Sequence, residues 1–339
     1  MKSSESNDLE VCATASTAKK GWSDETVGFV MSITSALCYT GSLSLMRGMS
    51  NYPDVSPDWT LAVKEMVTVS CVAPIILIQA LRGKYRFPSL AVFSTLVLAG
   101  VFCELIGARP HLWAYAAIGL TLTTPLVQAS QLIMSSVIGA VWLKERVTLV
   151  KALALVILIV AVFLLSLGSA NLEGEIAGSE MRLGFGAVCV VLTALGYSTQ
   201  LSLMRRVLRK RTPDGAETST EGGAFAATTM VMITVCGVGA ILFSSIFTMQ
   251  HGCAAWLEPP AQCWRIVLIA GVANMIGFVF QIESLRRLFV LKQTMIANAQ
   301  TIALALLGIF CFHEPFTQTI GIGIALVAAG VALAGLAKN

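Results

Sequence analysis

The residues of this chain most able to do chemistry are ionisable side chains that lie inside long apolar stretches. They are Lys64, Glu65, Glu104, Arg109, His111 and Glu283. A charge in apolar surroundings is costly unless it is paired, so each of these residues marks a binding site, a proton relay or an ion pair. We therefore expect polar binding or proton exchange where these stretches meet.

One of these stretches has a polar stripe. Glu104, Ala108, His111 and Tyr115 follow the spacing i, i+4, i+7 and i+11. On a helix, positions with this spacing fall within about 60° of one another, on one face. A carboxylate and an imidazole on that face can each take up a proton or bind a polar ligand.

Amide and phenol side chains lie at similar depths in other stretches. Gln131, Asn298 and Gln300 lie near the middles of their segments, and Tyr39 and Tyr197 lie near the ends of theirs. An amide offers two donors and an acceptor, which suits an uncharged or zwitterionic ligand. Adhesion between helices explains the glutamines equally well, and a buried tyrosine is often only a core residue.

The sequence contains none of the motifs of the common hydrolases and nucleotide-binding enzymes. It has no HExxH, GxSxG or GxxxxGK[ST] pattern, and its five aspartates fall outside the apolar segments. We expect no enzyme activity, no cofactor and no metal site. Cys253 and Cys263 share one predicted loop, where a disulfide and two free thiols are equal alternatives.

The composition shows what must position these residues. Of the 339 residues, 56% are hydrophobic and 12% are charged, whereas soluble domains carry about 25% charged residues. This deficit excludes an ordinary soluble enzyme, a disordered chain and a nucleic-acid-binding protein. The lipid bilayer is the expected partner.

Ten apolar segments are long enough to be membrane-spanning helices, which predicts an all-α polytopic membrane protein. They cover residues 27–46, 60–81, 92–118, 122–142, 150–168, 184–204, 224–247, 265–285, 293–312 and 316–336. The third segment is overlong and contains Arg109-Pro110-His111, so we expect one long, kinked helix there.

The basic residues predict the orientation of these helices. With the N-terminus inside, 18 of the 23 lysines and arginines fall in inner segments, as the positive-inside rule requires. Both termini are then cytosolic. We expect the protein to lie in the cell (inner) membrane. Residues 1–26 form a polar cytosolic tail without the pattern of a signal peptide.

The chain contains an internal repeat. Tyr39–Arg47 matches Tyr197–Arg205 at an offset of 158 residues, and Ile106-Gly107 matches Ile276-Gly277 at an offset of 170. Lys144–Thr148 corresponds to His313–Thr317 at an offset of 169. Because each copy holds five spans, an odd number, the second copy must cross the membrane in the opposite sense.

The predicted domains follow from this repeat. The five-helix halves are residues 27–168 and 184–339, an outer linker covers residues 169–183, and a cytosolic insertion covers residues 205–223.

The repeat also relates the polar residues to one another. Glu104 maps to Asn274 and His111 to Gln281 at the offset of 170, and Gln131 maps to Gln300 at 169. We expect these residues to line one cavity near the midplane of the membrane. The alternative is a set of hydrogen bonds between helices.

The charged residues near this stripe leave two interpretations open. Arg109 could bind an anionic group of a substrate or pair with Glu65, and we favour the ion pair. Lys64 and Glu283 are further candidates for charge pairs.

The residues Trp142–Thr148, together with His313–Thr317, resemble the EamA-like group of the drug/metabolite transporter superfamily. Lys64, in Ala62–Met66, falls where that family tends to have a basic residue. Many relatives carry a proline in the middle of spans four and nine, where this chain has Gln131-Leu132 and Gln300-Thr301. The resemblance implies ten spans and secondary transport, and it leaves the substrate open.

These observations predict a secondary transporter that works by alternating access. We expect a small polar or amino-acid-like metabolite as substrate, moved outward. The alternatives are an exporter of cationic amphiphilic drugs, in which Glu104 and Glu283 would matter, and a passive channel.

Protons are a candidate coupling ion for this transport. Glu104 would carry the proton, and His111 would modulate it or bind substrate. The competing interpretation is a static hydrogen bond from these residues to Asn274 or Gln281.

Overall fold

The computed structural model describes residues 23–52, 54–82, 88–118, 120–144, 148–170, 180–211, 217–219, 224–312 and 318–336. Most of the predicted tail, most of the predicted linker, much of the insertion and the Glu145 and Glu314 motifs lie outside the described residues.

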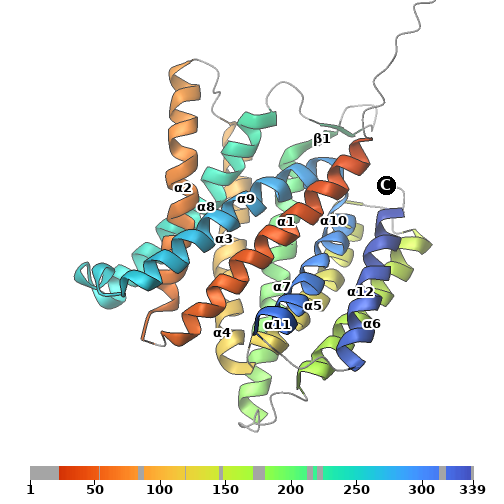
Figure 1. Ribbon diagram of the computed structural model, residues 1–339. Helices are drawn as coiled ribbons and strands as arrows, with labels where there is room; N and C mark the ends of the chain where they lie inside the picture. Colours follow the sequence, from red (N-terminus) through yellow and green to blue (C-terminus); the bar gives the residue numbers. More distant parts are fainter. Residues whose placement is uncertain are drawn as a thin grey trace, which may run out of the picture.

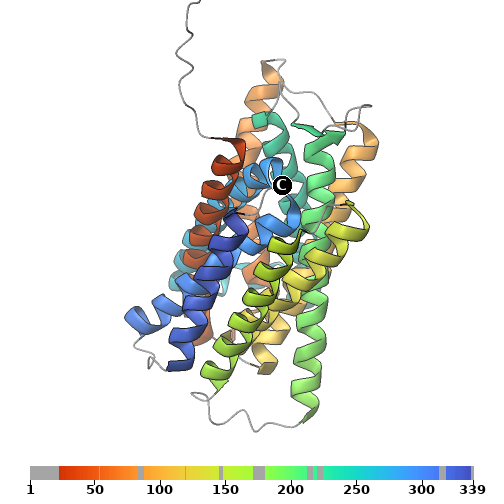
Figure 2. The same ribbon diagram turned by 90° about the vertical axis from the view of Figure 1, so that its right-hand side faces the viewer.

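The described chain is almost entirely helical (Figures 1 and 2). The first half contains α1 (Asp24–Arg47), α2 (Pro57–Leu81), α3 (Leu90–Val101), α4 (Arg109–Ile118), α5 (Leu120–Val141) and α6 (Leu149–Ala170). The second half contains α7 (Glu180–Leu208), α8 (Ala224–His251), α9 (Ala261–Arg287), α10 (Val290–Ala297), α11 (Ala299–Phe312) and α12 (Gln318–Leu336). The short elements are η1 (Gly48–Asn51), η2 (Phe102–Ala108), η3 (Ala254–Leu257) and the antiparallel pair β1 (Arg209–Arg211) and β2 (Glu217–Ser219).

Eight helical stretches in the described part of the chain are long and apolar enough to cross a membrane. Apolar stretches of 16 residues, 149–164 and 321–336, are shorter. The chain is therefore an integral membrane protein. A satisfied backbone and an apolar exterior, such as Leu77, Val156 and Phe310, are what a lipid environment demands.

The third predicted span is one continuous but distorted helix, as expected. Between α3 and α4 the chain forms a π-helical turn, η2, in which the Arg109 N–H donates to the Glu104 carbonyl oxygen. Pro110 has no N–H and cannot continue the normal ladder, so the wider turn satisfies the backbone just before it. The wider turn also holds Glu104 and changes the direction of the residues that follow.

The ninth predicted span contains an irregular turn, which the sequence does not predict. At Asn298, between α10 and α11, the regular helical pattern is interrupted for one residue, although the backbone stays helical and the stretch 290–307 forms one span. The Asn298 side-chain Nδ2 donates to the Thr294 carbonyl oxygen at 2.8 Å, a contact through which asparagine competes with the helical backbone.

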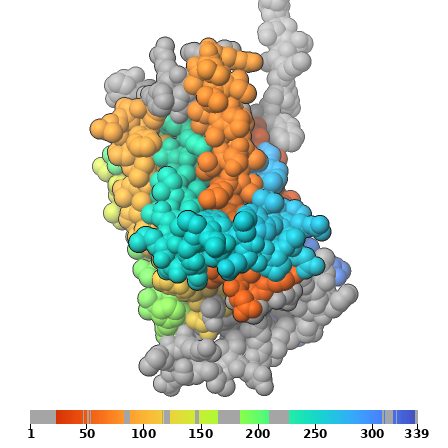
Figure 3. Space-filling model, turned by 90° about the vertical axis from the view of Figure 1, so that its left-hand side faces the viewer, coloured from red at the N-terminus to blue at the C-terminus, as the bar shows by residue number. Residues whose placement is uncertain are grey.

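Helices of the first half of the chain pack in pairs with helices of the second half. The helix α1 packs along α9, and α7 packs in the same way against η2 and α4. The contact of α5 with α7 is matched by that of α11 with α1, while α2 pairs with α8 and α6 with α12. Figure 3 shows α8 lying beside α2 on one face of the bundle. The start of α1 and the end of α12 lie at the same end of the bundle (Figure 1).

Candidate functional site

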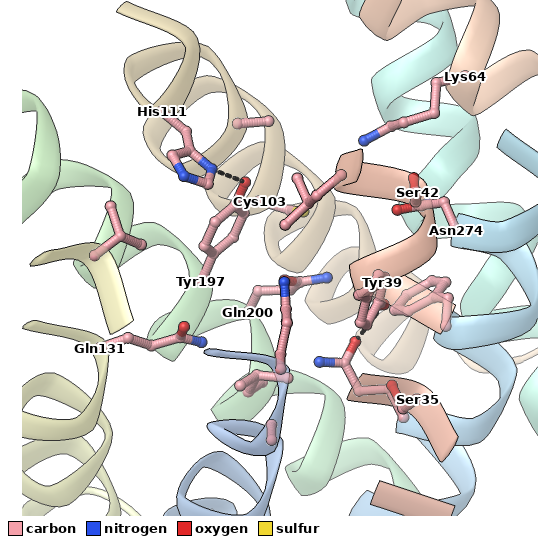
Figure 4. Close-up of a pocket in the computed structure, with 18 of the residues that line it drawn as sticks. Ser35, Tyr39, Ser42, Lys64, Cys103, His111, Gln131, Tyr197, Gln200 and Asn274 are labelled. Carbon is pink, nitrogen blue, oxygen red and sulfur yellow. Dashed lines mark hydrogen bonds between the residues drawn. The ribbon is translucent and has the colours of Figure 1, made fainter. Parts of the chain in front are cut away.

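A cavity of about 230 Å³ lies inside the bundle, between helices of both halves. Nine of the ten residues predicted as substrate ligands line it: Tyr39, Glu104, His111, Tyr115, Gln131, Tyr197, Asn274, Gln281 and Gln300. Lys64 and Glu65 line it as well. The tenth, Asn298, is fully buried at the helix break and does not line it. Figure 4 shows His111, Gln131 and Tyr197 on one side of this cavity and Tyr39, Lys64 and Asn274 on the other.

Two tyrosines make matching contacts on opposite sides of this cavity. The Tyr39 hydroxyl donates to Oε1 of Gln281 at 2.9 Å. The Tyr197 hydroxyl lies 3.3 Å from Nδ1 of His111, within hydrogen-bonding distance (Figure 4). Tyr39 and Tyr197 are related by the offset of 158, and His111 and Gln281 by the offset of 170. The two pairs are therefore equivalent under the repeat.

A second pair of contacts is equivalent in the same way. The Ser35 hydroxyl donates to the Gly277 carbonyl oxygen at 2.8 Å. The Thr193 hydroxyl donates to the Gly107 carbonyl oxygen at 3.2 Å. Again the hydroxyl residues differ by 158 positions and the glycines by 170. The two contacts thus have the same separations in sequence as the two tyrosine contacts.

A tyrosine ring packs closely against each of these glycines, and at Gly107 it leaves no room for a Cβ atom. A Cβ atom at Gly107 would lie 2.7 Å from the Tyr197 ring, and one at Gly277 would lie 3.3 Å from the Tyr39 ring. A Cβ atom at Gly196 would lie 2.5 Å from the Gly107 backbone nitrogen. Here α7 and η2 touch through their backbones, which no larger residue permits.

Two carboxylates and one ammonium group meet at the cavity wall. The Lys64 Nζ lies 3.1 Å from Oε1 of Glu65. A Cβ atom at Gly239 of α8 would lie 2.9 Å from Cδ of Glu104 and 3.0 Å from Cγ of Glu65, so these two side chains lie side by side. The Oε2 atom of Glu104 is buried and has no hydrogen-bond partner. One cation therefore faces two acids.

The structure corrects the predicted partner of Arg109. Its guanidinium lies 3.3 Å from Oδ2 of Asp58 and 5.2 Å from the centre of the Trp113 ring, outside the cavity lining. Glu65 pairs with Lys64 instead. The π-helical turn changes the direction in which Arg109 points, and Asp58 lies in the first turn of α2 rather than in a loop. Arg109 is thus held in an ion pair, with a different acid.

Glu283 also lies outside the cavity lining, at one end of the bundle. It accepts a hydrogen bond from Thr228 at 2.7 Å and pairs with Arg287 at 2.9 Å and with Arg286 at 3.7 Å. This network links α8 to α9.

Cys253 and Cys263 are free thiols in the structure, so the disulfide alternative is not realised. Cys263 is fully buried against Trp59 and Val267, whereas Cys253 is exposed. The two side chains therefore point into different environments. In the described residues, no group of three or more His, Cys, Asp and Glu could hold a metal ion.

The cavity extends toward one end of the bundle. Met46, near the end of α1, lines it, but the equivalent Met204 is fully buried. Beyond Met204, Arg205 donates to the Leu285 carbonyl oxygen at 2.8 Å and to that of Leu288.

An aromatic ring between two cations completes the closure beyond Met204. The Phe289 ring lies 4.6 Å from the Lys151 ammonium and 4.8 Å from the Arg205 guanidinium. At this end Met204, Arg205 and Lys151 are buried, and the half-buried Phe289 contacts both cations; we call it the sealed end.

Seven polar lining residues are missing from the sequence-based prediction: Ser35, Ser42, Thr124, Gln128, Gln200, Gln293 and Thr294. Ser42 and Gln200 are related by the offset of 158, so the repeat contained a signal for both. Gln293 maps to Thr124 at the offset of 169, so the repeat does not pair it with a second amide.

The chain is similar to known proteins in sequence and in fold. The glucose uptake protein GlcU of Bacillus subtilis (strain 168) is 24% identical over 260 residues, which are 74% of this chain and 81% of that protein. A protein of known crystal structure superimposes with a TM-score of 0.65 at 16% identity, over 91% of this chain and 96% of that one. No model of a known protein family matches. Similarity to a transport protein and the apolar helices support a membrane transporter.

Proposed function

We propose that this chain is a secondary transporter that moves a small, uncharged polar metabolite of the sugar class by alternating access. The observation that carries the proposal is the polar cavity, which is lined by equivalent residues of two halves and sealed at one end. A carrier needs a site that opens to one side at a time. A second state, open to the other side, follows when each half adopts the conformation that the other half had.

The equivalent contacts support an inverted repeat of five plus five spans, the arrangement implied by the resemblance to the EamA-like drug/metabolite transporters. Tyr39 with Gln281, and Tyr197 with His111, are the clearest pair. The helices α6 and α12 complete the ten, because their 22 and 19 residues correspond to about 33 and 28 Å at 1.5 Å per residue. A bilayer core is about 30 Å thick.

The sealed end is the cytosolic end in this proposal. Arg205, Arg286, Arg287 and Lys292 lie there, near the start of α1. Basic residues concentrate on the cytosolic side of membrane proteins. The cavity then extends toward the outside.

The charges and size of the cavity favour a small neutral solute. Lys64 is paired with Glu65, and Arg109 is paired with Asp58 outside the cavity, so no unpaired guanidinium is offered to an amino-acid carboxylate. The remaining lining is rich in amides and hydroxyls, which bind polyhydroxylated solutes. A volume of about 230 Å³ lies below the roughly 300–1,000 Å³ of sites for drug-sized ligands. This supports a metabolite over an amphiphilic drug.

Proton coupling belongs to the same proposal. Glu104 is ionisable where the second half has Asn274, and its buried Oε2 has no partner. A buried carboxyl group in that position is favoured in its protonated, neutral form. The outward direction of transport stays a prediction. The Bacillus relative is named as an uptake protein, which is the opposite direction.

Counterflow in proteoliposomes tests the proposal. Vesicles loaded with unlabelled D-glucose should transiently accumulate labelled D-glucose from a dilute external solution, because a carrier exchanges solute faster than it returns empty. Other small sugars, polyols and neutral amino acids are tested in parallel. Flux without stimulation by internal solute, for every compound, would establish a channel and refute the carrier.

A further inference from the structure

Buried polar atoms without hydrogen-bond partners gather around the cavity. Among the described residues they include Oε2 of Glu104, Nε2 of His111 and both amide atoms of Gln293. All three residues line the cavity. An unsatisfied buried polar group costs free energy, and native proteins keep few of them without a reason.

Gln293 has both ends of its amide unpaired. Its side chain is 1% exposed, and neither Oε1 nor Nε2 has a partner. By contrast, the amide of Gln281 accepts a hydrogen bond from Tyr39. The neighbouring Thr294 hydroxyl is also engaged, because it donates to the Val290 carbonyl oxygen at 2.9 Å.

Gln293 lies in the first half of α10, before the irregular turn at Asn298. The helix α10 contains eight residues and ends before Asn298, whose Oδ1 is also buried without a partner. Gln293 lies directly against the cavity, so its unpaired amide can bind a polar solute there.

We propose that Gln293 binds two neighbouring hydroxyl groups of the transported solute and thereby selects for vicinal diols. The inference rests on the proposed function. The amide Nε2–H donates to one hydroxyl oxygen, and Oε1 accepts from the other hydroxyl. A primary amide presents its donor and acceptor side by side, so adjacent hydroxyls satisfy both ends at once.

Selectivity follows from what happens when one hydroxyl is missing. A solute with a single hydroxyl at this place leaves one end of the Gln293 amide buried and unpaired. Sites built to bind a hydroxyl group discriminate strongly against analogues that lack it. We expect the loss of either hydroxyl to raise the solute concentration for half-saturation by about 10- to 100-fold.

The experiment compares D-glucose with its monodeoxy analogues in counterflow, using the full-length protein in proteoliposomes. The variants are Gln293→Met, which keeps length but removes both polar atoms, and Gln293→Asn, which keeps an amide on a shorter side chain. Gln250→Met, at the exposed end of α8, is the matched control.

In the parent protein and the control, two analogues that lack neighbouring hydroxyls should show half-saturation about 10- to 100-fold higher than D-glucose. Gln293→Met should bind D-glucose as weakly as it binds these analogues, whereas Gln293→Asn should retain part of the difference.

Three results would overturn the inference. If Gln293→Met, or Gln293→Asn where the first variant does not fold, discriminates as well as the parent, the amide does not bind the diol. Exchange of neutral amino acids with no exchange of sugars or polyols would refute the diol while leaving the transporter intact. Absence of exchange for every solute would refute the proposed function itself.

Discussion

At the scale of single residues, the group with the greatest electrostatic consequence is the trio of Lys64, Glu65 and Glu104. One ammonium neutralises one carboxylate, so the other must be compensated by a proton or a ligand when it is buried. Cys236 and Tyr39 face Glu65, while Cys103 and Tyr197 face Glu104. These neighbours are neutral in their ordinary protonated forms, which leaves Lys64 as the balancing charge nearby.

Glu104→Gln tests the predicted proton carrier. The substitution keeps shape and hydrogen bonding but removes the titrating group, so the variant should lose accumulation driven by a pH gradient while retaining counterflow. Both activities are measured in the same proteoliposomes. Glu258→Gln, in the exposed loop before α9, serves as the control. Normal accumulation by Glu104→Gln would remove Glu104 from the coupling mechanism.

Gln131 and Gln300 should both contribute to transport, because both line the cavity at equivalent positions. Replacing either with Ala removes a ligand of the solute and should raise half-saturation by about 5- to 10-fold, the equivalent of roughly 1 kcal/mol. The exposed Gln250→Ala should change nothing measurable. Unaltered kinetics in both cavity variants would assign these amides to helix packing.

Most of the polar cavity residues could be predicted because the sequence contains two related polar stripes. The helical spacing of Glu104, His111 and Tyr115 and the offset to Asn274 and Gln281 place them on facing walls. The partner of Arg109 could not be predicted, since the π-helical turn abolishes the regular 3.6-residue periodicity just before it.

At the scale of elements, α8 packs closely against the side chains of Glu104 and Glu65 at one residue, Gly239. Gly239→Ala would place a Cβ atom 2.9 Å from Glu104 and 3.0 Å from Glu65. Overpacking of this kind costs about 1–3 kcal/mol, and it should also disturb the proton coupling described above. We expect a lower melting temperature and weaker pH-driven accumulation.

Gly237 supplies the matched control on the same helix. A Cβ atom there meets nothing within 4 Å, so Gly237→Ala should leave stability within about 1 kcal/mol of the parent, with helix propensity in its favour. Thermal unfolding in detergent measures both variants. Equal melting temperatures for Gly239→Ala and Gly237→Ala would show that the two carboxylates can shift away from a Cβ atom without loss of stability.

Helix positions were predictable, and so was the distortion beside Pro110, but the irregular turn at Asn298 was not. The segment predicted at 265–285 is α9, Ala261–Arg287, and that at 184–204 is α7, Glu180–Leu208. Apolar length sets both, because a span must match the bilayer. The irregular turn at Asn298 has no glycine or proline beside it, and the local side-chain hydrogen bond to Thr294 is the feature that accompanies it.

At the scale of the whole molecule, the sealed end should control which side the cavity faces. Phe289→Ala removes the ring between Lys151 and Arg205 and leaves both cations without that contact. Closure at this end should weaken, so a Cys placed at Gln293 should react with maleimide several-fold faster in the variant when the reagent is added from the cytosolic side. The same reaction from the other side should slow. Unchanged rates from both sides would show that Phe289 does not hold this end shut.

The orientation of the molecule can be tested with its own cysteines. Cys253 is exposed between α8 and α9, on the outer side if the N-terminus is cytosolic. In intact cells it should therefore react with a membrane-impermeant maleimide, and Cys253→Ser should remove that labelling. In the Cys253→Ser background, a Cys at Lys144, which is exposed after α5, should react only after permeabilisation, because the intervening spans place it in the cytosol. Labelling of position 144 from outside, with protection of Cys253, would invert the bundle and direct the cavity toward the cytosol.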